Sequence, residues 1–132
     1  MGKKWACHQL SKSAEGEVLL FIDADTVHHP ATFSQSDKAL LSERVEMLTA
    51  LPHQQILSWG ERFIVPIFFF LMVFMPIPLD YRLRSPVFSV AIGQFMLFRR
   101  SAFEKIGGYT AIRGHVTDDV ALARRIKQSG LP

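Results

Sequence analysis

Cysteine is almost absent from this sequence, and no cluster of metal ligands replaces it. The single cysteine, Cys7, cannot form a disulfide within the chain. No set of cysteines and histidines stands at the spacing of a zinc site, so neither a disulfide scaffold nor structural zinc is expected. The amino-terminal stretch MGKKWACHQL is basic but lacks the apolar core and cleavage site of a secretory signal peptide.

An excess of charge of one sign is also missing. The 15 Lys and Arg residues against 12 Asp and Glu residues give a net charge of only +3. The basic residues are interspersed rather than gathered in a stripe, so nucleic acid is not an expected partner. Hydrophobic residues make up 48% of the 132 positions, which is enough for one domain-sized core and excludes disorder of the whole chain.

One long apolar run, Phe63–Leu79, interrupts this even composition. It has 17 residues without a charge and contains five of the 11 phenylalanines. As a helix it would cover about 26 Å, slightly less than the ~30 Å hydrocarbon core of a bilayer. Pro66, Pro76 and Pro78 are expected to break or bound such a helix. Arginines on both flanks suit a membrane interface. Three interpretations remain open: a transmembrane helix, an interfacial or re-entrant element, or buried soluble core.

Apolar runs and helix signals alternate along the rest of the chain, which predicts an α/β fold. The run at 17–22, EVLLFI, is too short for a helix and indicates a buried, parallel-type strand. Further strands are expected at 45–51, where a continuing helix also fits, and at 87–98. Helices are predicted at 3–14, 30–42, after Ser101 and after Thr117.

Two carboxylates, Asp23 and Asp25, follow the first predicted strand directly. Ligands of open α/β sheets bind where strands end, so this position favours a functional site. Carboxylates this close repel one another unless a cation lies between them. Their oxygens suit Mg²⁺ or Mn²⁺ held jointly with a diphosphate. The alternative is a solvated turn, in which aspartate is common because of its local hydrogen bonds.

A second acidic pair, Asp118 and Asp119, opens the last predicted helix. Acidic residues there stabilise the helix dipole, so a purely structural role is one interpretation. The other is that one carboxylate acts as a general base. Gly107 and Gly108 either only end the preceding helix or also let the backbone approach a ligand. Lone histidines such as His28 favour surface or turn positions over ligand roles.

These elements occur in a specific order. It runs Gly-Lys-x-Trp-Ala, an apolar strand, Asp-x-Asp, a long interval, Gly-Gln-Phe-Met-Leu-Phe-Arg-Arg, Ile-Gly-Gly-Tyr, and Asp-Asp opening a helix. Over nearly its whole length the chain resembles the family 2 glycosyltransferases of GT-A fold. Within them it is similar to the membrane-associated enzymes that glycosylate lipids such as ceramide or carotenoids. The resemblance implies a partial GT-A fold with a hydrophobic membrane-associated insertion at 63–79.

The resemblance assigns roles at the donor site. Lys3 looks like the lysine near the nucleotide diphosphate. Asp23 and Asp25 match the Asp-x-Asp pair, with Asp25 the principal ligand of Mg²⁺ or Mn²⁺ and Asp23 nearer the ribose or sugar. The donor implied is a nucleotide-diphospho-sugar, expected to be a uridine diphosphate-sugar.

The resemblance also assigns the catalytic base. Asp118 and Asp119 match a Glu-Asp pair of the family, which makes Asp119 the candidate base and Asp118 a conservative departure. Gly107, Gly108 and Tyr109 resemble the loop that borders the sugar and the acceptor. The implied reaction is an inverting displacement by a hydroxyl of a lipid-like acceptor. The implied location is the membrane, with the catalytic face cytoplasmic.

Two departures and two alternatives qualify this interpretation. The family's first strand should lie upstream of Gly2, and no Gln-x-x-Arg-Trp element precedes Pro132, so the chain looks like a single partial catalytic domain, inactive by itself.

VLLFI followed by Asp-x-Asp also fits a haloacid-dehalogenase-like phosphatase, in which Asp23 would be the nucleophile and Asp25 an acid/base. A non-catalytic membrane-associated remnant is the remaining alternative.

Overall fold

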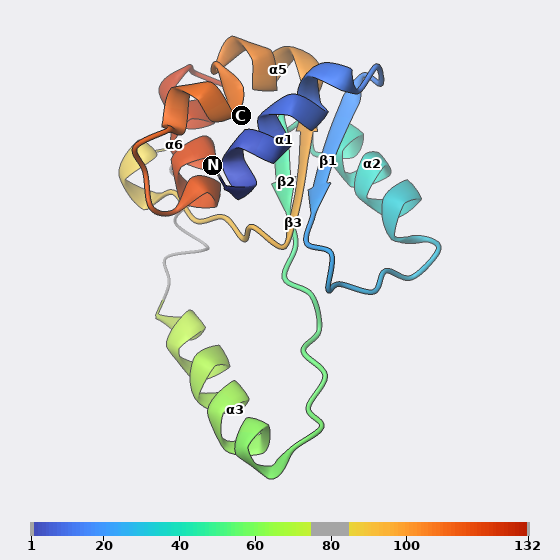
Figure 1. Cartoon of the computed structure of the whole chain (residues 1–132), viewed down its shortest axis with the longest axis vertical. Helices are drawn as coiled ribbons and strands as arrows, with labels where there is room; N and C mark the ends of the chain where they lie inside the picture. The colour runs from blue at the N-terminus through green and yellow to red at the C-terminus, as the bar shows by residue number, and fades with distance from the viewer. Residues whose placement is uncertain (1, 75–84, 132) are drawn as a thin grey trace.

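The protein is built around a three-stranded antiparallel sheet (Figure 1). The computed structural model describes residues 2–74 and 85–131. The strands are β1 (Val18–Ile22), β2 (Met47–Thr49) and β3 (Phe95–Arg99), in the order β1-β3-β2. Leu20 and Leu48 both pair with Leu97 of the central strand. Strand β3 therefore holds the sheet together by itself.

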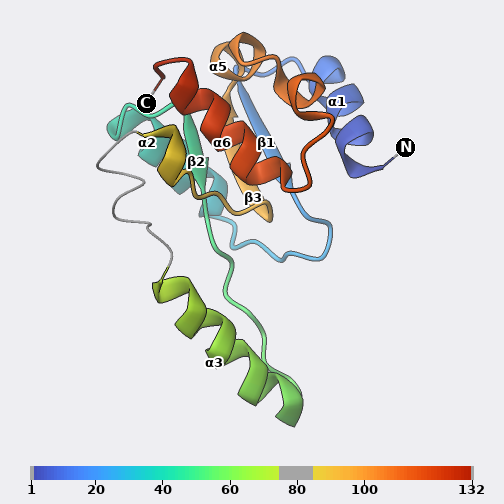
Figure 2. The same ribbon diagram turned by 90° about the vertical axis from the view of Figure 1, so that its left-hand side faces the viewer.

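Helices cover both faces of the sheet (Figures 1 and 2). Side chains alternate across a strand, so Met96 and Phe98 of β3 pack on one face while Phe95 and Leu97 pack on the other. The first face lies under α1 (Lys3–Ser13), α5 (Arg100–Lys105), the 3₁₀ turn η2 (Gly108–Ile112) and α6 (Asp118–Gln128). The second face receives Leu40 of α2 (Thr32–Ser42).

The mixed α/β class is confirmed, but one strand expectation is wrong. The segment at 17–22 was expected to be a parallel-type strand, whereas β1 runs antiparallel to β3. Apolar residues on both sides of a strand indicate that both faces are covered, as they are here. They do not fix the direction of the neighbouring strand, which depends on how the chain returns to the sheet.

The strand expected at 87–98 is shorter than predicted. Pro86–Phe88 forms a 3₁₀ turn, η1, and regular pairing begins only at Phe95. The backbone N–H of Gly93 donates to the carboxylate of Asp119 instead of to a strand. Apolar composition alone did not reveal this diversion of the backbone toward another helix.

Helix α3 (Trp59–Val73) stands apart from the α/β body, as both views show (Figures 1 and 2). Ser58 and Glu61 form a capping box that starts it. Contrary to expectation, the helix continues through Pro66. Most of its large apolar side chains are exposed, among them Phe63 at 70% and Phe70 at 63%, so the buried-core interpretation of this segment is wrong for its described part.

The remainder of the apolar run, residues 75–79, and the flanking arginines at 82 and 84 lie outside the described residues. Within the described ranges, no helix combines the length and the apolarity needed to cross a membrane.

The glycine pair after α5 provides a test of the packing on the first face. Gly107 and Gly108 both have positive φ, and a Cβ built on Gly108 would lie 2.7 Å from Cε1 of the buried Phe103 ring. Alanine at 108 therefore combines backbone strain with overpacking. We expect Gly108→Ala to lower the free energy of unfolding by about 1–3 kcal/mol, measured by urea denaturation.

The matched control is Gly114→Ala, since nothing lies within 4 Å of a Cβ at that position and its φ is not in the left-handed region. Equal stability of the two variants would contradict the close packing of Gly108 against Phe103.

Candidate active site

The first acidic pair occupies a tight turn at the end of β1. Strand β1 ends at Ile22, and Asp23 follows at once. The carbonyl oxygen of Asp23 accepts two hydrogen bonds from Thr26, one from its N–H at 3.2 Å and one from its hydroxyl at 2.7 Å. These bonds close the turn that carries Asp23 and Asp25. Asp23 is half-buried, and Asp25 is exposed.

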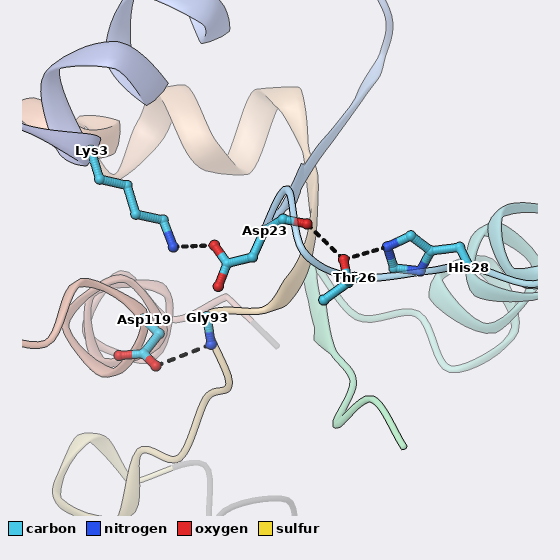
Figure 3. A network of polar contacts seen from close by, with 6 residues as sticks. All are labelled: Lys3, Asp23, Thr26, His28, Gly93 and Asp119. Carbon is cyan, nitrogen blue, oxygen red and sulfur yellow. Dashed lines mark hydrogen bonds and ion pairs between the residues drawn. The ribbon is translucent and has the colours of Figure 1, made fainter. Parts of the chain in front are cut away.

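Helix α1 contributes a cation to this turn. Nζ of Lys3 donates to Oδ1 of Asp23, and the two side chains point toward one another in Figure 3. The hydrogen bond from Asp23 is the main cause that raises the pKa of Lys3 above its ordinary value of 10.5, against the opposing effect of partial burial. The negative charges of Asp23 and Asp118 raise it further. Lys3 is therefore a fixed ammonium group beside the acidic turn.

Asp119 is held in place at the start of α6. Its Oδ2 accepts from the N–H of Gly93 at 3.1 Å (Figure 3). Its Oδ1 accepts from the N–H of Val120 at 2.8 Å. Each carboxylate oxygen has further lone pairs, so both bonds leave acceptor capacity free. Among the described residues no cation pairs with this carboxylate, so the two bonds orient it without neutralising it.

The two acidic sites are tied to adjacent residues of one loop. The N–H of Asp23 donates to the carbonyl of Gln94 at 3.3 Å, and the preceding residue, Gly93, donates to Asp119. The loop before β3 therefore fixes Asp23 and Asp119 relative to one another. Sequence reasoning gave Gly93 and Gln94 no such role. The only signal was a glycine inside the segment expected to be a strand, which is compatible with a close approach of backbone to a side chain.

Two adjoining clefts lie at this loop. The Asp25 cleft, about 670 Å³, is lined by Asp25, Thr26 and His28 among others. The Asp119 cleft, about 420 Å³, is lined by Asp119, by residues 90–94, and by three side chains of α3. The side chains from α3 are Phe68, Leu71 and Met72. The clefts share Leu51, Gln54 and Gln94 along their common boundary.

The remaining predicted residues lie elsewhere on the body. Asp118 lines a third cavity of about 730 Å³ together with Lys3 and Tyr109. Gly107 and Gly108 line a separate hollow beside α1 rather than either cleft. The structure thus brings together Lys3, Asp23 and the Asp119 loop, whereas a role of the two glycines in donor binding stays a prediction.

Comparison with known protein families identifies the family of this chain. The family described as "Glycosyltransferase like family 2" matches residues 1–132. The chain belongs to this family. No curated protein and no solved structure matches the chain significantly.

The chain is therefore a family 2 glycosyltransferase domain, an enzyme class that transfers sugar from a nucleotide sugar. Its mixed α/β architecture is consistent with a partial GT-A domain. The phosphatase alternative is wrong because the transferase family covers the same Asp-x-Asp segment and the whole chain around it. The family also favours an enzyme over a non-catalytic remnant.

Family 2 glycosyltransferases generally use a divalent metal ion through an Asp-x-Asp pair. Asp23 and Asp25 supply carboxylate oxygens, and the pairing with Lys3 uses only Oδ1 of Asp23. Across residues 2–74 and 85–131, no group of three or more His, Cys, Asp or Glu could hold a metal. An Mg²⁺ ion bound jointly with phosphates needs only one or two carboxylates. These residues fit an ion shared with a diphosphate, not one held by protein alone.

The contact between Lys3 and Asp23 makes a prediction about pH. Because the folded pKa of Lys3 is raised, the contribution of the pair to stability is present below pH 10.5 and is lost as the pH rises through the folded value. Replacing Asp23 with alanine removes the main cause, so the pKa of Lys3 should fall in Asp23→Ala, as measured by an NMR titration of the lysine Cε signals.

The control is Asp37→Ala, on the exposed side of α2, which should leave the titration of Lys3 unchanged. A Lys3 pKa that is the same in Asp23→Ala as in the parent would rule out the contact as its cause.

Proposed function

We propose that this glycosyltransferase is inverting and that it transfers its sugar to a hydroxyl group of a lipid-like acceptor. The observation that carries the proposal is the Asp119 cleft. Apolar side chains of α3 form one wall, and a carboxylate held by two backbone N–H groups lies on the other side. An acceptor with an apolar body and a terminal hydroxyl matches both features.

Asp119 is the general base in this proposal. Its carboxylate takes the proton of the acceptor hydroxyl as that oxygen bonds to the anomeric carbon of the donor sugar. The bond from the anomeric carbon to the diphosphate oxygen breaks in the same displacement, and the nucleotide diphosphate leaves. A single displacement inverts the configuration at that carbon and requires no covalent enzyme intermediate.

The donor, which we propose to be a uridine diphosphate-sugar, is assigned to the acidic turn. Lys3 would place a positive charge near the diphosphate, and Asp23 and Asp25 would hold Mg²⁺ or Mn²⁺, with Asp25 the principal ligand. The bound ion would neutralise the charge that develops on the leaving group. A sugar that joins the two sites would lie at the boundary between the clefts, where Gln54 and Gln94 offer amide groups.

Helix α3 is assigned to the membrane interface in the same proposal. Phe63, Ile64, Ile67 and Phe70 recur at the spacing of one helix face and are all exposed, and an apolar face left in water is unfavourable. Its described length corresponds to about 22 Å, less than a ~30 Å hydrocarbon core. The guanidinium of Arg62 lies 4.8 Å from the ring centre of Trp59, and such residues favour the headgroup level.

This placement would bring a lipid acceptor to the Asp119 cleft from the bilayer edge, because the wall of the cleft and the membrane-facing surface belong to one helix. Charged nucleotide sugars do not cross the bilayer core readily, so we propose that the catalytic body faces the cytoplasm, on the side where the donor is supplied.

The role of Asp119 can be tested with an isosteric change. Asp119→Asn keeps an oxygen acceptor but removes the basicity, so we expect transfer to fall by at least about 100-fold. Affinity for the donor should stay near that of the parent, because Asp119 lines the acceptor cleft and not the Asp25 cleft. Radiolabelled sugar transfer and calorimetric donor binding measure the two effects.

Asp37→Asn is the matched control, since Asp37 is exposed on α2 and lines neither cleft. Equal transfer rates in Asp119→Asn and the parent would remove Asp119 from the mechanism.

Membrane attachment can be tested with vesicles of phosphatidylcholine and phosphatidylglycerol. Burying one phenylalanine contributes about 1.5–3 kcal/mol, so Phe63→Ser combined with Phe70→Ser should weaken cosedimentation by more than about 10-fold. The control is Leu10→Ser combined with Val116→Ser, at two exposed apolar positions away from α3. If both double variants bind vesicles equally, α3 is not the attachment site.

A further inference from the structure

His28 has a place in the fold that its sequence context did not indicate. It follows the acidic turn by three residues and is half-buried, with its ring between α2 and the sheet. Its ring centroid lies 5.6 Å from that of Phe33 in α2 and 5.6 Å from that of Phe95 in β3. These contacts fix the ring, so the direction in which its nitrogens point is set by the packed body.

The single proton of the Thr26 hydroxyl determines the direction of the hydrogen bond between Thr26 and His28. A threonine hydroxyl has one proton, and Thr26 uses it to donate to the carbonyl oxygen of Asp23 at 2.7 Å. Nε2 of His28 lies 2.9 Å from the same hydroxyl oxygen (Figure 3). The hydroxyl must therefore accept from Nε2, which requires a proton on that nitrogen. A neutral imidazole in the Nε2–H tautomer satisfies this arrangement.

The acidic turn depends on such support because Asp25 has little of its own. Asp25 is exposed, and in the described part of the chain no hydrogen bond or ion pair holds its carboxylate. Its direction follows from the backbone of the turn. That backbone is held at the carbonyl of Asp23 through Thr26, and Thr26 is held in turn by His28.

We propose that His28 is a positioning residue for the donor site. Acting as an Nε2–H donor to Thr26, it fixes the turn so that Asp23 and Asp25 present their carboxylates together to a divalent ion and a diphosphate. In this role His28 acts through Thr26 and not as a ligand of the ion. This inference rests on the proposed donor role of the turn, but its hydrogen-bond pattern can be tested without any substrate.

The first experiment reads the tautomer of His28 directly. Two-dimensional spectra of the ¹⁵N-labelled imidazole in the neutral form should show the proton on Nε2. In Thr26→Val, which removes the acceptor and preserves the shape of the side chain, the Nε2 signal should shift. A neutral Nδ1–H tautomer in the parent would overturn the proposal irrespective of activity.

The second experiment measures Mn²⁺ binding in the presence of uridine diphosphate, by electron paramagnetic resonance of the free ion. His28→Leu should weaken Mn²⁺ binding about 5-fold, the factor that corresponds to one hydrogen bond of about 1 kcal/mol. His28→Gln retains a donor nitrogen and should stay within about twofold of the parent. Thr26→Val should reproduce the loss while leaving the His28 ring packed against Phe33 and Phe95.

His115→Leu is the matched control, because His115 is exposed and its ring lines neither cleft. Circular dichroism confirms that each variant is folded. Unchanged Mn²⁺ binding in His28→Leu would overturn the positioning role alone, because Thr26 donates to Asp23 independently of His28. Absence of Mn²⁺ binding to the parent with uridine diphosphate would instead overturn the proposed donor site, and the positioning role with it.

Discussion

The burial of β3 between two strands and two helical layers is the constraint on which the rest of the structure depends. Its residues from Phe95 to Phe98 are all buried, and both β1 and β2 pair with it. Burying apolar side chains on both faces of one strand ties the helices on either side to a common support. The loop that enters this strand therefore starts from a rigid point, and that loop carries Gly93 and Gln94.

Rigidity of this loop has a chemical consequence. Gly93 binds the carboxylate of Asp119, and Gln94 binds the backbone of Asp23. The two acidic residues, nearly a hundred positions apart in sequence, are therefore fixed relative to one another. A transferase needs its base and its donor site at a defined separation, because a displacement requires the attacking and leaving oxygens to be aligned. Hydrogen bonds from backbone N–H groups suit this purpose, since they have no side-chain freedom to lose.

Helix α3 is stabilised by different interactions from those that stabilise the α/β body. Its side chains gain little from burial within the described protein, and it starts with a strong capping box at Ser58 and Glu61. Local signals thus suffice to form the helix, whereas its exposed apolar surface calls for an apolar environment that the body does not provide. Phe68, Leu71 and Met72 of this helix line the Asp119 cleft and so connect its apolar surface to Asp119.

Much of this protein could be predicted from local sequence. Helix and strand positions followed from apolar spacing and from the glycines after α5, because each reflects the conformational preference of a few neighbouring residues. The matched motifs indicated the family and singled out Asp23, Asp25 and Asp119. The antiparallel direction of β1, the late start of the strand expected at 87–98, and the continuation of α3 through Pro66 were not predicted.

Only the tertiary structure decided how these residues meet. The contacts from Lys3 to Asp23, from Gly93 to Asp119, and from His28 to Thr26 depend on where packed helices and strands place side chains and backbone groups. The sequence determined which chemical groups are present and which local structures carry them. Their separations and hydrogen-bond partners emerged from the packing around β3, because contacts between distant segments are set by the whole fold and leave no fixed spacing in the chain.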